Sequence, residues 1–163
     1  MNPFVIDAFE FCRLKERREA DVAVAELPRL ASDLLNKTGS LHWALEGGNS
    51  KLEHAHLTLS VSGEVQLMCQ RCLAPYSFKM HSKSILVLAK NDEEADEIDT
   101  LLDDETLDVI VGSRAMNVTD LIEDEALLAM PLSPKHDICP DPEVSDAFKN
   151  KKESPFSVLK NLQ

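Results

Sequence analysis

Apolar and polar side chains alternate along the middle of the chain, which is the period of a half-buried β-strand. The alternation covers residues 41–45, 57–61 and 65–69. Shorter apolar runs at 22–24, 85–88 and 107–111 predict further strands, and Gly47-Gly48-Asn49-Ser50 predicts a turn. We therefore expect a mainly antiparallel β-sheet built from the central part of the chain.

Gly63 lies between two of these alternating runs and predicts a hairpin. A three-residue loop over 62–64 would pair Leu59 with Leu67, whereas a two-residue loop would place Gln66 opposite Leu59. Because a slip of one residue turns every side chain to the other face, we expect the three-residue loop.

Helical spacing of apolar residues predicts helices near 8–18, 27–36 and 118–130. Asp7 and Asn117 stand where N-caps are expected, with Glu10 placed to complete a capping box at the first helix. Helices packed on an antiparallel sheet make an α+β fold.

Composition and charge narrow the classes of function. Of the 163 residues, 44% are hydrophobic, which is enough for a packed core, and no apolar run is long enough to span a membrane. The N-terminal residues do not resemble a secretory signal, so we expect a cytoplasmic protein. The net charge of −12 argues against binding nucleic acid over a broad basic surface and favours a basic protein partner or a small local basic site.

The negative charge lies in the second half of the chain. Residues 91–108 hold ten acids and no base, which predicts a solvated acidic loop or insert at about 91–106. We expect residues 1–139 to form one α+β domain. Residues 140–163 then form a polar tail that ends in a short docking segment, Ser154–Leu159.

Two pairs of metal-ligand residues are the sharpest local motif. Cys69 and Cys72 form a Cys-x-x-Cys pair, and His136 and Cys139 form a second pair with the same spacing. Together they are a candidate site for structural zinc. The 63 residues between the pairs exceed the spacing of an ordinary zinc ribbon, so the same residues are also interpretable as a buried thiol, a turn thiol and two exposed side chains. A thiol oxidoreductase is the weaker reading, because no regular helix is predicted after Cys72.

Basic residues gather at one place in the first half of the chain. Arg13, Lys15, Arg17 and Arg18 fall at the end of the first predicted helix, and Arg71 stands inside the Cys-x-x-Cys pair. These five are candidates for contact with RNA or another partner, and the alternative is a solvated helix end.

Four motifs in order resemble the large ribosomal RNA subunit accumulation protein family, YceD. They are Cys69–Leu73, Asp120–Glu125 leading into Leu127–Pro131, the His/Cys segment, and a terminal Ser-Pro-Phe-x-x-Leu. The resemblance implies a non-enzymatic factor without catalytic residues that supports synthesis, processing or stability of 23S rRNA. Its partner would be precursor 23S rRNA or a large-subunit ribosomal protein, with no small-molecule substrate and no membrane. The competing interpretation is an acidic module that binds a basic protein unrelated to rRNA.

Overall fold

The computed structural model describes residues 4–49 and 54–139. Its largest element is a five-stranded sheet with the strand order β2-β3-β4-β5-β6. All neighbouring strands are antiparallel except β5 and β6, which run parallel. The strands are β2 (Arg17–Ala23), β3 (Ser40–Asn49), β4 (Ala55–Met68), β5 (Pro75–Ala89) and β6 (Leu107–Val111).

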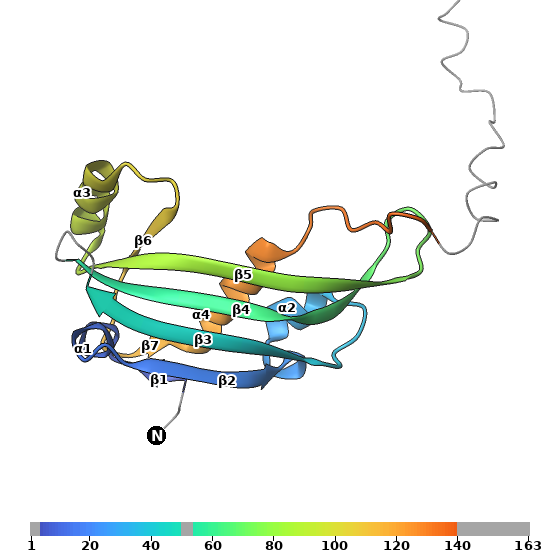
Figure 1. The fold of residues 1–163 in the computed structure, drawn as a ribbon, viewed down its shortest axis with the longest axis horizontal. Coiled ribbons are helices and arrows are strands. Elements are labelled where there is room, and N and C mark those ends of the chain that lie inside the picture. The colour runs from blue at the N-terminus through green and yellow to red at the C-terminus, as the bar shows by residue number, and fades with distance from the viewer. Residues whose placement is uncertain (1–3, 50–53, 140–163) are drawn as a thin grey trace, which may run out of the picture.

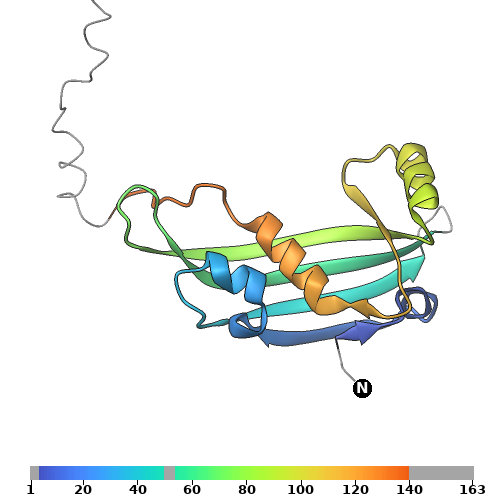
Figure 2. The ribbon, with the colours of Figure 1, turned by 180° about the vertical axis from the view of Figure 1, so that it is seen from behind.

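Two helices cover one face of this sheet. The helices α2 (Pro28–Asp33) and α4 (Val118–Ala129) lie across that face, as the view from behind shows (Figure 2). The helices α1 (Ala8–Arg13) and α3 (Asp92–Leu102) lie at the same end of the sheet but at its opposite edges (Figure 1). α3 packs on the face that α2 and α4 leave free, through Val87 and Ala89 of β5. A 3₁₀ turn, Val24–Glu26, precedes α2, and a small second sheet pairs β1 (Val5–Ile6) with β7 (Met116–Asn117). No helix within the described ranges has the length and apolar character that crossing a membrane requires.

The core lies between the covered face of the sheet and α4. Every second residue of β4 from Leu57 to Leu67, apart from Gly63, is a buried apolar side chain. Ile122 and Ala126 of α4 are fully buried against this layer. The α+β prediction is therefore confirmed, and so are the helix at α4 and its cap, because the Asn117 side chain accepts a hydrogen bond from the Thr119 N–H at 3.0 Å.

The predicted hairpin at residues 62–64 is wrong. β4 runs unbroken from Ala55 to Met68 and pairs with β5 from His56 to Met68. The apolar positions on both sides of Gly63 are all odd-numbered, so one continuous strand keeps them on the same face without a turn. Gly63 is present because a Cβ there would lie 2.6 Å from Leu41 Cδ2 on the neighbouring strand. Gly47, Gly48 and Asn49, which are predicted to turn the chain, lie instead in β3, and Ser50 is outside the described residues.

The first helix ends earlier than predicted. Asp7 caps it as expected, but Glu10 is bound to Arg13 instead of reaching back to the cap. Lys15 adopts a left-handed conformation, with φ 52°, and its N–H bonds to the Cys12 carbonyl. The next N–H bonds back to the Phe11 carbonyl, which completes a Schellman motif without glycine. Arg17 and Arg18 therefore lie in β2, and α2 is also shorter than the predicted 27–36.

The acidic stretch after β5 is a helix, not the predicted loop. The Asn91 side chain caps α3 by accepting a hydrogen bond from the Glu94 N–H at 2.8 Å. Three acids in the first turn are favourable at the positive end of the helix dipole. Ile98 is 2% exposed and packs on Val87 and Ala89 of β5, which attaches the helix to the sheet.

Gly47 is a site where a single methyl group should destabilise the fold. A Cβ at this position would lie 2.6 Å from the Phe11 carbonyl oxygen and 2.9 Å from Cys12 Cα, and both are backbone atoms. We expect Gly47→Ala to lower the free energy of unfolding by about 1–3 kcal/mol, as overpacking does. Gly48→Ala is the control, because its Cβ meets only the His56 ring, which can rotate. Urea denaturation curves measure both, and equal losses would contradict the explanation.

Candidate metal centre

A tight turn joins β4 to β5 and presents the two cysteines of the Cys-x-x-Cys motif. The Cys69 N–H bonds to the Ala74 carbonyl at 3.0 Å, and the Leu73 N–H bonds to the Cys69 carbonyl at 2.9 Å. Leu73 has a φ of 60°, in the left-handed region. This conformation helps to reverse the chain directly after Cys72.

The segment after α4 runs back along this turn (Figures 1 and 2). The Gln70 N–H donates to the Pro134 carbonyl at 2.8 Å, and the His136 N–H donates to Cys69 Sγ at 3.4 Å. The His136 ring meets the Tyr76 ring edge-on, with centroids 5.3 Å apart. These contacts place His136 and Cys139 beside Cys69 and Cys72.

The four predicted ligand residues therefore converge in space. One ligand atom from each of Cys69, Cys72, His136 and Cys139 lies within 4.8 Å of all the others. In a tetrahedral zinc site with Zn–S bonds of about 2.3 Å, neighbouring sulfurs are about 3.8 Å apart, so only a small contraction is needed. Three thiols and one imidazole are a donor set typical of structural zinc. The cluster could bind a metal ion such as zinc.

The histidine ring is already oriented for this role. His136 Nε2 lies 3.0 Å from the Pro75 carbonyl oxygen, which can only accept a hydrogen bond, so Nε2 carries the proton. Nδ1 is then the free lone-pair nitrogen, and it lies 3.4 Å from Cys72 Sγ, inside the cluster. A carbonyl that fixes the tautomer from the outer side is the usual support of a metal-binding histidine.

The electrostatics of the cluster favour a bound cation. Burial opposes ionisation of the Cys69 thiol, but N–H groups of Cys72, His136 and Arg71 point at its sulfur and lower the pKa of Cys69 to about 5. Burial raises the pKa of Cys139, and the neighbouring sulfurs of Cys72 and Cys69 raise it further. One sulfur is thus set up as a thiolate, and a second requires a positive charge nearby before it ionises.

Leu73 should be replaceable by glycine with a gain in stability. A branched side chain in the left-handed region costs about 1–2 kcal/mol, while glycine costs about 0.5–1 kcal/mol in unfolded-chain entropy. Leu73 is 66% exposed, so few contacts would be lost. We expect Leu73→Gly to raise the free energy of unfolding by about 0.5–1 kcal/mol in urea denaturation. A loss of stability would show that the Leu73 side chain matters more than its backbone strain.

The five candidate basic residues do not form one patch. Arg13 is paired with Glu10 and lines a hollow together with Lys90, Arg114 and two acids. Arg17 bonds to Glu19, and Arg18 lies near Glu16 and over the Phe11 ring. Lys15 forms the turn between α1 and β2. Arg71 is in the Cys turn at the opposite end of the sheet, about 30 Å from Arg17 along β4.

Glu123 has a structural role that the sequence pattern did not indicate. Its side chain is 3% exposed and reaches α2. Its carboxylate accepts hydrogen bonds from the N–H groups of Arg29 at 2.8 Å and Leu30 at 3.1 Å. It therefore satisfies the start of α2, where the chain supplies no side-chain cap of its own.

The chain is similar to one family of known proteins. The family model described as the large ribosomal RNA subunit accumulation protein YceD matches residues 57–163, which is more than half of the chain. The match begins in β4 and includes all four residues of the metal cluster. No solved structure matches the chain. The chain belongs to the YceD family of large ribosomal RNA subunit accumulation proteins.

Proposed function

We propose that this protein supports the synthesis, processing or stability of 23S rRNA during large-subunit assembly, and that it acts in the cytoplasm by binding and not by catalysis. Family membership carries this proposal, since it implies a role in the accumulation of large-subunit rRNA. The charge of the protein and the metal cluster support the proposal that it acts by binding.

The charge favours a protein partner over a long RNA contact. The net charge is −12, and three of the five candidate basic residues already lie beside a carboxylate of their own chain. Binding RNA tightly requires several Lys or Arg side chains that are free to neutralise phosphates. A large-subunit ribosomal protein fits this surface better than precursor 23S rRNA does.

The metal cluster fits a structural role better than a redox role. Redox-active Cys-x-x-Cys pairs sit at a helix N-terminus, where the dipole lowers a thiol pKa. Here the pair is followed by the strand β5, and Cys69 is completely buried. Zinc held by Cys69, Cys72, His136 and Cys139 would tie the segment after α4 to the β4–β5 turn.

An RNA titration tests the protein-mediated route. We expect the purified chain to bind 23S rRNA fragments weakly at physiological salt, because its net charge is −12 and phosphates repel an acidic protein. Filter binding over a range of salt concentrations measures this. Tight binding that falls steeply with salt would overturn the protein-mediated route while leaving the rRNA role intact. Binding to a basic protein together with normal rRNA levels in a deletion strain would instead favour the unrelated acidic module.

A further inference from the structure

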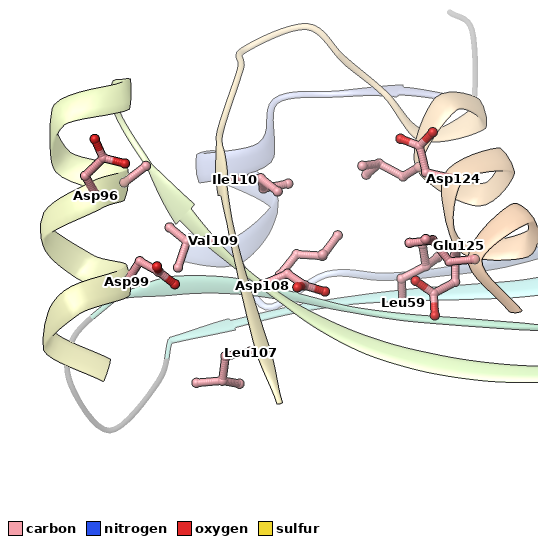
Figure 3. Close-up of a pocket in the computed structure, with 13 residues that line it drawn as sticks. Leu59, Asp96, Asp99, Leu107, Asp108, Val109, Ile110, Asp124 and Glu125 are labelled. Carbon is pink, nitrogen blue, oxygen red and sulfur yellow. The ribbon is translucent and has the colours of Figure 1, made fainter. Parts of the chain in front are cut away.

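A groove between α3 and α4 combines an acidic rim with an apolar floor. Its volume is about 510 Å³, and the edge strand β6 runs through it (Figure 3). The rim holds carboxylates from three separate elements: Asp96 and Asp99 of α3, Asp108 of β6, and Asp124 and Glu125 of α4. No basic residue of the described chain is among the lining residues.

The rim is only partly neutralised by the rest of the described chain. Asp124 pairs with Arg29 at 2.7 Å, and Glu125 accepts a hydrogen bond from the Ser82 hydroxyl. Among the described residues, no ion pair is formed by the side chains of Asp96, Asp99 or Asp108. The groove therefore favours a cationic occupant and disfavours RNA, whose phosphates these carboxylates would repel.

The floor and the α4 wall offer apolar contact. Leu59 and Leu86 are buried at the bottom, while Leu128 is 82% exposed at the edge. An exposed leucine beside an apolar floor and an acidic rim suits a segment that carries both Lys and bulky apolar side chains.

We propose that the occupant is the C-terminal segment of the same chain, residues 148–163. This segment carries four lysines against one acid, Glu153, in a chain whose net charge is −12. Three of its apolar residues, Phe156, Val158 and Leu159, follow Ser154-Pro155 closely in the sequence. The positive charge of the segment therefore matches the acidic rim, and its apolar residues match the apolar floor.

The chain between Cys139 and Phe156 is long enough for the C-terminal segment to reach the groove. His136 is held against Pro75 at the start of β5, and Leu86 in the groove lies farther along that same strand, about 36 Å away at 3.3 Å per residue. From Cys139 to Phe156 an extended chain spans up to about 58 Å, which leaves slack for passing around α4. Attachment to the same molecule also gives the segment an effective concentration of about millimolar, so modest contacts suffice.

A second hollow lies nearer to Cys139 but matches the segment poorly. Among the described residues, Asp33 is the only charged one that lines this hollow. The other lining residues are uncharged and include Met68, Leu127 and Leu132. It offers apolar contact without a cluster of carboxylates for the lysines. Leu132 is fully exposed at its edge, as Leu128 is at the acidic groove, which makes the two leucines a matched pair for testing.

Zero-length carbodiimide cross-linking of the full chain tests the proposal. An equal mixture of unlabelled and ¹⁵N-labelled protein is treated and digested, and Lys–carboxylate links are identified by mass spectrometry. We expect links from Lys149, Lys151, Lys152 or Lys160 to the groove carboxylates, each within one isotopic form. Leu128→Ser and Phe156→Ser should lower their yield by about tenfold, the effect of losing one buried apolar side chain, while Leu132→Ser leaves it unchanged.

Three results would overturn the proposal. Links of mixed isotopic composition would show that the segment docks on a second copy. Links to Asp33, or an equal loss with Leu132→Ser, would place it in the other hollow. Equal yields of cross-links in the wild type and the three variants would show that the segment has no defined docking site. Both leucines project into solvent, so neither substitution is expected to disturb the fold on which the comparison depends.

Discussion

Cys69→Ser should abolish zinc binding and release the segment after α4 from the sheet. The wild-type chain, purified without chelator, is expected to hold about one zinc ion, and the variant almost none, because structural zinc sites require all their ligands. Apparent binding free energies of structural zinc are about 10–16 kcal/mol, so this is the largest effect that we expect from one side chain. Elemental analysis measures the zinc. Limited proteolysis between Met130 and Cys139 measures the release.

Cys12→Ala is the matched control for this experiment. Cys12 is also buried, but its thiol donates to the His56 carbonyl at 3.1 Å and takes no part in the cluster. Its replacement should leave the zinc content unchanged. A wild-type chain that contains no zinc after growth with added zinc would contradict the metal assignment, whatever the variants do.

Glu123→Ala should cost about 2–4 kcal/mol of stability, because it leaves two N–H groups at the start of α2 without an acceptor. The Leu30 N–H is buried, so water cannot replace the carboxylate there. For a chain of this size the melting temperature is expected to fall by roughly 5–10 °C. Glu123→Gln keeps one acceptor oxygen and should cost less than the alanine variant.

Asp124→Ala is the control for Glu123. Asp124 binds the same Arg29, but its side chain is 57% exposed. Exposed ion pairs contribute about 0–1 kcal/mol, so this variant should be nearly as stable as the wild type. Equal losses in the two alanine variants would mean that Arg29, and not the start of α2, is the group that matters.

Periodicity predicted the elements better than it predicted where they end. Most strands and helices are predicted in the right places because their buried faces follow periods of two and 3.6 residues, but α3 lies where a loop is predicted. Gly63 predicts a turn because glycine favours turns, whereas in the structure it makes room for Leu41 on the next strand. Lys15 ends a helix in a conformation for which glycine is the usual signal.

The residue types and their spacing indicate the ligands of the metal cluster, but not that the two pairs meet in space. The spacing of Cys69 with Cys72, and of His136 with Cys139, identified both halves of the site. Only the fold brings the halves together, because α4 returns the chain across the sheet to the β4–β5 turn. The role of Glu123 depends on the packing of α4 against α2, two elements far apart in sequence, and no local pattern predicts it.

The ratio of 23S to 16S rRNA in cells tests the central claim most directly. We expect deletion of the gene to lower this ratio and the wild-type chain to restore it. The Cys69→Ser variant should restore it poorly, since its zinc cluster is lost. A ratio that stays unchanged after deletion would contradict a role in 23S rRNA accumulation.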